Sequence, residues 1–427
     1  MNADTIVFNA GELVTCASGG VPKRGDAMRE LGIIKNGAVA VADGRIAAVG
    51  TTDEITSVYT AAEMIDAEGR VVMPGFVDPH THIVYAGDRL NEFELKIRGA
   101  DYLEILAAGG GIISTVKATR ATSQEDLVAD ALLRLDKMLA CGTTTCEIKT
   151  GYGLDMETEL KMVRVIAALD KTHPISMVPT FLAAHAIPPE FKDDADGYVE
   201  LICEEMLPAA WEWYEASHFG GKAPFFADVF AERSAFSVEQ AGKIFGAAKE
   251  LGFAVKAHVD QFTNLGGSRL GVELSAASID HLDAISDDEI EMLAVSGTVG
   301  VVIPTENFNA GKTQFAPARK LIDAGCAVAV STDFNPGSAP CPSQPMTMAI
   351  ACRYQKLIPA EAINAATINA AFAIGMGEEV GSIELGKRAD IIILDAEDHR
   401  AAVYEFGVSP VASVLAGGSP AGKSKSL

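Results

Sequence analysis

The chain has 427 residues, 48% of them hydrophobic and 22% charged, which is the composition of a globular protein with a large buried core. Its formal net charge of −24 argues against nucleic-acid binding and against a polybasic membrane surface, so we expect neither nucleic acid nor membrane as a partner. An anionic ligand would need a cationic side chain at its own binding site.

Short strand patterns separated by turns occupy both ends of the chain. They cover residues 5–9, 37–41, 45–49 and 70–72 near the N-terminus, and residues 381–385, 390–394, 402–405 and 411–415 near the C-terminus. Asp43-Gly44 lies between two of these patterns and is a strong hairpin signal. We predict one small β-sandwich domain built from residues 1–73 and 377–427.

The middle of the chain alternates between apolar strand-like runs and segments of helical period. The runs cover residues 75–82, 143–149, 175–185, 225–232, 254–262, 278–282, 299–304 and 327–332. The helical segments include residues 123–140, 155–169, 238–251, 286–295 and 316–324. Strands that alternate with helices form parallel βαβ units, and eight such units form a closed barrel. We therefore predict an α/β fold, with a (β/α)8 TIM-like barrel over residues 74–376.

Polar side chains gather where the predicted barrel strands end, which is where catalytic groups lie in such barrels. The first run ends at His80 and His82, the third at His185, the fifth at His258, the sixth at His281, and the eighth is followed by Asp333. His80 and His82 share one face because they are two residues apart on an extended strand. A site for one metal needs three or four protein ligands and a water. His80, His82, His258 and Asp333 meet that number. His185 and His281 then remain for substrate binding or proton transfer.

Imidazole and carboxylate ligands suit zinc or ferrous iron, so we expect one divalent metal, Zn or Fe. Such a metal would bring the pKa of a water toward neutrality. Asp333 is our candidate for the carboxylate that takes the water's proton and passes it to a leaving nitrogen. Lys149 ends the second run two residues after Glu147. A structural ion pair and a role in the site both remain open for this lysine.

At this point the sequence resembles a known family. Pro74-Gly75-Phe76-Val77-Asp78 before the two histidines, the later histidines and the aspartate after the last strand are similar to the amidohydrolase superfamily. Within it the chain resembles the imidazolonepropionases over essentially its whole length. The carrying segments are Ala86-Gly87-Asp88-Arg89 with Glu92-Phe93, Ala107 with Gly109-Gly110-Gly111-Ile112, Glu147-Ile148-Lys149-Thr150-Gly151-Tyr152-Gly153-Leu154, Ala183-Ala184-His185-Ala186, Asn264-Leu265-Gly266-Gly267 and Ser331-Thr332-Asp333-Phe334-Asn335-Pro336-Gly337-Ser338.

The resemblance implies a hydrolase of histidine degradation that opens the ring of 4-imidazolone-5-propanoate to N-formimino-L-glutamate. By the family's pattern the substrate is held by Arg89, Tyr152 and His185, with Asn335, Gly337 and Ser338 forming the pocket after the last strand. The planar guanidinium of Arg89 can donate two parallel hydrogen bonds to the propanoate carboxylate. His281 is assigned to the nucleophilic water and Gln261 to the imidazolone ring. Members with two metals bridge them with a modified lysine on the fourth strand, and residues 229–232 contain no lysine, which implies one metal.

The chain departs from the family after the seventh strand, where a Leu-Pro-Gly followed by apolar residues is usual. Here the segment from Ile303 to Gly311 reads IPTENFNAG, which is markedly more polar and places Glu306 near the barrel mouth. The charge of Glu306 would be unfavourable near an anionic substrate tail unless its side chain faces away. The exact substrate therefore stays open. The alternatives are a superfamily hydrolase or deaminase of another small nitrogen heterocycle, and a metal-free scaffold protein on the same fold.

The remaining sequence features concern location and assembly. The N-terminus lacks a basic segment followed by an apolar one, and no apolar run reaches the roughly 18 residues of a membrane span. The seven cysteines include no Cys-x-x-Cys pair, which fits a reducing compartment. We expect a cytoplasmic enzyme whose partner is a small anionic heterocycle, and we leave a homodimer open.

Overall fold

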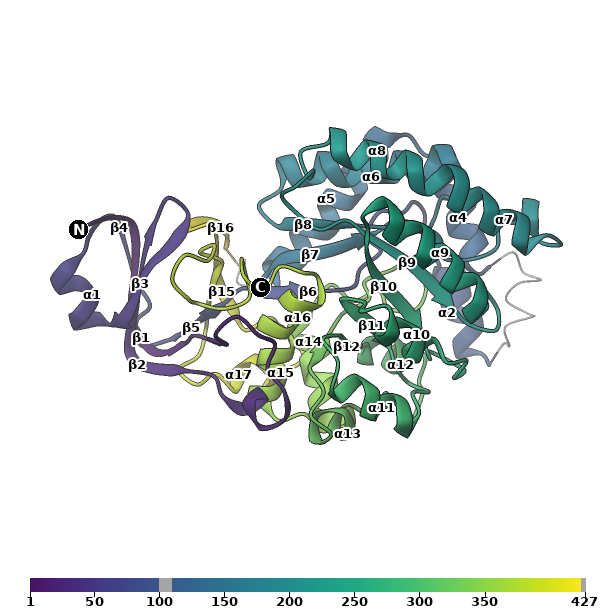
Figure 1. Cartoon of the computed structure of the whole chain (residues 1–427). Helices are drawn as coiled ribbons and strands as arrows, with labels where there is room; N and C mark the ends of the chain where they lie inside the picture. Colours follow the sequence, from purple (N-terminus) through teal and green to yellow (C-terminus); the bar gives the residue numbers. More distant parts are fainter. Residues whose placement is uncertain (100–109, 424–427) are drawn as a thin grey trace.

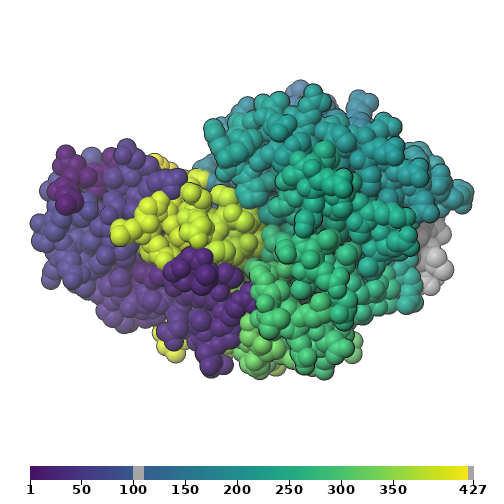
Figure 2. Space-filling model, in the orientation of Figure 1, coloured from purple at the N-terminus to yellow at the C-terminus, as the bar shows by residue number. Residues whose placement is uncertain are grey.

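The computed structural model describes residues 1–99 and 110–423, and two eight-stranded sheets organise them (Figure 1). One sheet forms the barrel, and the other combines strands from both ends of the chain. In the space-filling view the N-terminal and C-terminal segments form one lobe beside the barrel (Figure 2). None of the helices in the described part of the chain has the length and apolar character that a bilayer crossing requires.

The barrel sheet contains the eight strands expected from the sequence, each paired in parallel with the next. They are β6 (Phe76–Asp78), β7 (Thr143–Lys149), β8 (Ser176–Ala184), β9 (Phe226–Ala231), β10 (Ala254–Val259), β11 (Ser278–His281), β12 (Val299–Val302) and β13 (Val328–Val330). The first and last strands meet just beyond their ends, where the His82 amide donates to the Phe334 carbonyl at 3.0 Å. Buried Asp78 strengthens this closure by accepting hydrogen bonds from Ser331 and Thr332. The predicted TIM-like barrel is confirmed.

Helices cover the barrel because their apolar stripes repeat with the helical period. In α9 (Val238–Leu251), Ala241, Ile244, Phe245 and Ala248 are buried, and the Ser237 hydroxyl caps the first turn. The other helices that the sequence indicated are α5 (Gln124–Ala140), α6 (Met156–Thr172), α11 (Asp287–Ala294) and α13 (Ala318–Asp323). The remaining helical elements of the barrel region are α2 (Leu90–Ile97), α4 (Ile112–Ala121), η2 (Pro189–Phe191), α7 (Ala195–Leu201), η3 (Ile202–Met206), α8 (Leu207–Ala216), α10 (Gly267–Glu273), α12 (Pro304–Asn309), α14 (Gln344–Ile350), η4 (Ala351–Gln355), α15 (Pro359–Ala365) and α16 (Ile368–Ala373).

The second sheet is mixed and draws on both termini, as predicted. Its order is β16-β15-β14-β5-β1-β2-β3, with β4 paired to β1. The strands are β1 (Asn2–Val14), β2 (Ile33–Ala42), β3 (Arg45–Thr51), β4 (Thr60–Asp66), β5 (Val71–Pro74), β14 (Ile391–Leu394), β15 (Val411–Ala416) and β16 (Ser419–Lys423). Asp43 and Gly44 both have positive φ between β2 and β3, so the expected hairpin turn is present. The domain boundaries that we place at residues 73/74 and 376/377 stay a prediction.

Two predicted strands of this region are wrong. Residues 381–385 are irregular, because the Ser382 and Lys387 side chains bond to each other and to Glu384 within one turn. Residues 402–405 lie mostly in the short helix α17 (Ala401–Tyr404), which buries the adjacent Ala402 and Val403. The sequence analysis also missed η1 (Gly25–Arg29), α1 (Thr52–Val58), β4 and β16. Most of β4 is exposed, so it lacks the apolar alternation that marks a strand.

Candidate metal centre and active site

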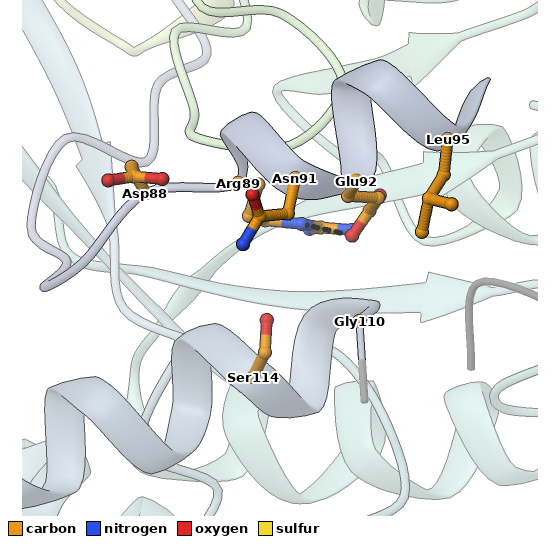
Figure 3. A pocket seen from close by; sticks show the side chains of 7 residues that line it. All are labelled: Asp88, Arg89, Asn91, Glu92, Leu95, Gly110 and Ser114. Atoms are coloured by element: carbon orange, nitrogen blue, oxygen red, sulfur yellow. Dashed lines mark hydrogen bonds and ion pairs between the residues drawn. The ribbon is translucent and has the colours of Figure 1, made fainter. Parts of the chain in front are cut away.

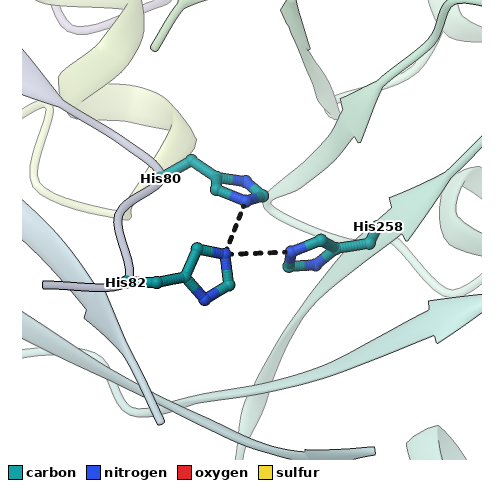
Figure 4. Close-up of side chains that lie close together, drawn as sticks. All are labelled: His80, His82 and His258. Atoms are coloured by element: carbon teal, nitrogen blue, oxygen red, sulfur yellow. Dashed lines mark hydrogen bonds between the residues drawn. The ribbon is translucent and has the colours of Figure 1, made fainter. Parts of the chain in front are cut away.

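Three histidines converge at the carboxyl end of the barrel strands. His80 and His82 follow β6, and His258 lies near the end of β10 (Figure 4). The Nε2 atom of His82 lies 3.3 Å from Nε2 of His80 and 3.4 Å from Nε2 of His258. Asp333 brings its Oδ1 atom to 3.6 Å from His80 Nε2 and 3.5 Å from His82 Nε2. The structure therefore brings together the four side chains that the sequence suggested as ligands.

This spacing fits a metal ion. Two nitrogen ligands about 2.05 Å from a metal at the tetrahedral angle lie about 3.3 Å apart, which matches the observed separations. His80, His82 and His258 are buried, and each offers one nitrogen within 4.8 Å of the others. Bare imidazole nitrogens so close together repel one another, and a cation between them removes that repulsion. The donor set of three imidazoles and one carboxylate suits zinc or iron.

Two aspartates orient the histidine rings from the side opposite the cluster. Asp280 accepts from His80 Nδ1 at 2.7 Å, and Asp228 accepts from His258 Nδ1 at 3.0 Å. A hydrogen bond donated by Nδ1 leaves the Nε2 lone pair available for a metal. Burial lowers the pKa of His258 to about 3 and holds the pKa values of His80 and His82 well below their usual range. Neutral imidazole, the form that binds metal, is therefore favoured.

Asp333 lies on a tight turn that follows β13 after Ser331 and Thr332, and it has a φ of 50°. The Asn335 amide donates to the Asp333 carbonyl at 2.7 Å, and the Ser338 hydroxyl lies 3.4 Å from Asp333 Oδ2. Burial raises the pKa of the Asp333 carboxyl to about 7, and His281 opposes that rise. A bound cation would lower this pKa. The turn thus directs one carboxylate oxygen at the histidines and the other toward Ser338.

His281 ends β11 and packs against the histidine cluster, with its ring centroid 5.3 Å from those of both His80 and His258. Its Nδ1 atom lies 3.7 Å from Glu306 Oε2, and Lys312 holds the other oxygen of Glu306 at 3.1 Å. Burial opposes ionisation of Glu306, but His281 and Lys312 lower the pKa of its carboxyl to about 2, and Gln261 also favours the charged form. Burial would likewise lower the pKa of His281, but Glu306 and Asp333 raise it above its ordinary value.

The polar segment after the seventh strand is therefore ordered by the ion pairs of Glu306 and by hydrogen bonds. Residues 304–309 form α12, which buries Thr305, Glu306 and Asn307. The Thr305 hydroxyl donates to the Thr332 carbonyl, and Asn307 donates to Asp283. The negative charge of Glu306, which looked unfavourable near an anionic substrate, is compensated by His281 and Lys312.

His185 and Tyr152 line the other side of the cluster. The His185 ring stacks on the His82 ring with centroids 4.9 Å apart, and its Nδ1 hydrogen-bonds the Gly151 carbonyl at 3.0 Å. Tyr152 is buried, with its ring centroid 5.8 Å from that of His82. Buried Glu159 fixes this loop by accepting hydrogen bonds from the backbone amides of Gly151, Gly153 and Leu154. A side chain at Gly151 would lie only 2.8 Å from His185, so the close approach requires glycine.

Arg89 lies beside the loop that follows Asp333. Its Nε and Nη2 atoms form a two-pronged ion pair with Glu92, and Lys96 also contacts Glu92 at 2.8 Å. The guanidinium packs directly against Gly337, where a Cβ would lie 2.2 Å from Arg89 Nη1. A pocket between α2 and α4 is lined by Asp88, Arg89, Asn91, Glu92, Leu95, Gly110 and Ser114 (Figure 3). Gly109, part of the glycine cluster noted in the sequence, lies outside the described residues.

Comparison with known proteins identifies the family. A model of the amidohydrolase family matches residues 71–421, and a model of the bacterial imidazolonepropionase-like composite domain matches residues 37–62. The imidazolonepropionase of Chloroflexus aggregans is 52% identical over 413 residues, which are 96% of this chain and 97% of that relative. The imidazolonepropionase of Herpetosiphon aurantiacus is also 52% identical, with 97% of this chain and 96% of the relative covered. The chain belongs to the imidazolonepropionase family of amidohydrolases.

Solved structures outside the imidazolonepropionases share the fold. An adenosine deaminase from Xanthomonas campestris with bound zinc has a TM-score of 0.74 at 21% identity and covers 98% of this chain and 93% of its own. Escherichia coli guanine deaminase has a TM-score of 0.71 at 16% identity, with 98% and 99% covered. At such identities the likeness concerns the fold alone. Amidohydrolases generally use a metal, and the buried histidine cluster offers this chain a place for one.

Among the residues expected from the imidazolonepropionase pattern, the structure places His185, His281 and Tyr152 around the histidine cluster. Arg89 and Gly337 touch each other, and Asn335 and Ser338 form the turn after Asp333. Gln261 is a neighbour of Glu306. The roles assigned to these residues stay predictions. The other three histidines pair with acids elsewhere: His173 with Asp136, His218 with Asp170 and His399 with Glu12.

The sequence analysis did not single out Asp228 and Asp280, although both were detectable. Asp228 is the one charged residue within β9, and Asp280 directly precedes His281 on β11. An acid inside an otherwise apolar barrel strand must find a partner in the interior. That rule would have pointed to both residues as partners for the histidines.

Proposed function

We propose that the protein hydrolyses 4-imidazolone-5-propanoate to N-formimino-L-glutamate, a cyclic amide opening in histidine degradation. The observation that carries this proposal is the convergence of His80, His82, His258 and Asp333. It occurs in a chain that is 52% identical, over almost its whole length, to an imidazolonepropionase. The fold alone would leave the reaction open, because one fold hosts many reactions.

One divalent metal, Zn or Fe, would be held by His80, His82, His258 and Asp333. When bound, it polarises a carbonyl and brings the pKa of a water near neutrality. Asp333 has its second carboxylate oxygen free of the histidines, and this oxygen takes the proton from the attacking water. The same carboxyl then gives that proton to the ring nitrogen as the C–N bond breaks. His281, steadied by Glu306, hydrogen-bonds the water from the other side.

The propanoate tail of the substrate is assigned to Arg89. The guanidinium is planar and already aligned by Glu92, so it loses little freedom when it binds a second carboxylate. Tyr152 and His185 would hold the ring from the side of His82, and Gln261 from the side of Glu306. Asn335, Gly337 and Ser338 would shape the pocket after β13.

The test is direct. Purified protein loaded with zinc or iron is incubated with 4-imidazolone-5-propanoate, and the decay of ring absorbance is followed while the product is identified by its mass. We expect turnover to N-formimino-L-glutamate, and its loss in Asp333→Asn. Absence of turnover, together with activity on another nitrogen heterocycle, would favour the competing assignment. A protein that binds no metal would favour the scaffold.

The competing assignment is a hydrolase or deaminase of another small nitrogen heterocycle. The observation that favours it is the polar segment with buried Glu306 beside His281. We also propose a cytoplasmic location, because all seven cysteines are free thiols. Assembly into a homodimer is a further proposal, which light scattering of the purified protein tests.

A further inference from the structure

The buried side chain of Lys149 lies near the histidine cluster but has no role in the proposed reaction. Lys149, at the end of β7, places its Nζ atom 2.6 Å from Glu147 Oε1 and 2.8 Å from Asp228 Oδ2. The same nitrogen lies 3.9 Å from Asp280 Oδ2. All four side chains are fully buried, with 0% of their surface exposed. An ammonium group in such a place is retained only where carboxylates surround it.

The two aspartates that Lys149 contacts are the ones that orient the metal-site histidines. Asp228 Oδ2 faces Lys149 and also accepts from His258 Nδ1 at 3.0 Å. Asp280 Oδ2 faces Lys149 and also accepts from His80 Nδ1 at 2.7 Å. Two chains of contacts, one from each histidine, therefore meet at a single ammonium group.

This arrangement has an electrostatic consequence. Two buried carboxylates near the same point repel each other, and the ammonium group of Lys149, which contacts both, offsets that repulsion. Burial would lower the pKa of Lys149, but Asp228, Glu147 and Asp280 raise it above its ordinary value, so the ammonium persists.

We propose that Lys149 is a positioning residue of the metal centre, which holds Asp228 and Asp280 as paired acceptors for His258 and His80. By fixing both rings it keeps two Nε2 lone pairs directed at the metal. The inference rests on the metal site of the proposed function and not on the identity of the substrate.

A second buried lysine lies near the same network but contacts only one of the two aspartates. Lys256, on β10, lies 3.4 Å from Asp280 Oδ2 and also bonds to the Ser278 hydroxyl and the Ala373 carbonyl. It therefore supports the Asp280 side of the network, whereas Lys149 contacts both aspartates. The two lysines carry two formal positive charges, whereas Glu147, Asp228 and Asp280 carry three negative ones. This excess of negative charge favours a cation at the histidine cluster.

The experiment compares Lys149→Met, Lys149→Gln and Lys149→Arg with Lys387→Met. Lys387 is also buried, but it donates to the Gly377 carbonyl and the Ser382 hydroxyl, outside this network. The affinity of each protein for Zn²⁺ is measured by competition with a chromogenic chelator, and the thermal unfolding of each metal-free protein is recorded separately. Neither readout needs a substrate.

We expect Lys149→Met to weaken Zn²⁺ binding by about 10- to 100-fold, the usual effect of removing a partner behind a metal ligand. Lys149→Gln should lose less Zn²⁺ affinity, because its side-chain amide can still donate to Asp228. This variant keeps the test informative if Lys149→Met does not fold. Lys149→Arg should keep most of the wild-type affinity for Zn²⁺, because it preserves the positive charge. Lys387→Met should bind Zn²⁺ like the wild type even if it unfolds at a lower temperature.

Wild-type Zn²⁺ affinity in folded Lys149→Gln and Lys149→Met would overturn the inference and leave Lys149 a structural ion pair. Equal losses in the Lys149 and Lys387 variants would also overturn it. If the wild-type protein itself bound no Zn²⁺, the proposed metal site would fail as well, so failure of the two proposals can be told apart.

Discussion

Substituting alanine for Gly337 tests the placement of Arg89 with a single added methyl group. A Cβ built on Gly337 would lie 2.2 Å from Arg89 Nη1 and 2.6 Å from its Cζ. Ordinary contact between such atoms begins at about 3.4 Å, so the guanidinium must move by about 1.2 Å. The atom in the way is the end of a flexible side chain, and Gly337 does not have a positive φ. The fold should therefore survive while Arg89 is displaced.

The expected size of the effect follows from that movement. A misplacement of about 1 Å in a positioning group costs roughly 100-fold in rate or affinity. Loss of one hydrogen bond to a charged group costs about 1.5–3 kcal/mol, or about 10- to 150-fold. We expect KM for 4-imidazolone-5-propanoate to rise about 10- to 100-fold in Gly337→Ala, with a smaller change in kcat, because the propanoate tail is remote from the bond that breaks.

A double-mutant cycle with Arg89→Met decides whether Arg89 carries this effect. Gly337→Ala should raise KM strongly in the wild-type background and have almost no further effect once Arg89 is gone. Gly297→Ala is the matched control, since Gly297 is exposed and a Cβ there would meet no described atom within 4 Å. Equal penalties in both backgrounds, or an unchanged KM in Gly337→Ala, would refute the assignment of Arg89 to the substrate carboxylate.

Three further outcomes are expected. Glu306→Gln, which weakens the 3.7 Å contact to His281, should lower kcat by about 10-fold with unchanged metal content, and loss of bound metal instead would contradict the placement of Glu306. Chelation should abolish activity and lower the melting temperature, and one equivalent of zinc or iron per chain should restore both, whereas a requirement for two would contradict the single site. Burial raises the pKa of the Cys352 thiol to about 11. Because only the thiolate reacts, the rate of Cys352 alkylation, measured by mass spectrometry, should rise about tenfold per pH unit up to that value. A plateau near pH 9 would show an ordinary thiol.

The barrel was predictable because its strands are buried on both faces. Such strands read as continuous apolar runs, and all eight were recognised within a few residues of their observed ends. The second sheet was harder, because its strands are short or exposed. β4 is mostly exposed and owes its place to pairing with β1, a contact between residues about 60 positions apart. Local pattern carries no information about such pairing.

The site was predictable to the extent that its residues stand at strand ends. His80, His82, His258 and Asp333 could be grouped because parallel strands of a barrel end on one face. What could not be foreseen is how charge is balanced inside. Glu306 looked unfavourable in the sequence, since Lys312 comes six residues later and His281 is on another strand. Only the folded α12 brings these partners together.

The interior of this barrel differs from an ordinary apolar core in a way that ties stability to metal binding. Lys149, Asp228 and Asp280 occupy positions that apolar side chains of similar volume could fill, and a well-packed apolar core is often at least as stable as a buried ion network. Their retention beneath His80 and His258 therefore points to the orientation of those rings. A buried network tolerates the loss of one member poorly, because the partner left behind is an unpaired charge. Metal binding at the histidine cluster should accordingly be sensitive to substitutions of Lys149, Asp228 and Asp280, which do not contact the metal, and insensitive to changes on the exposed rim of the barrel.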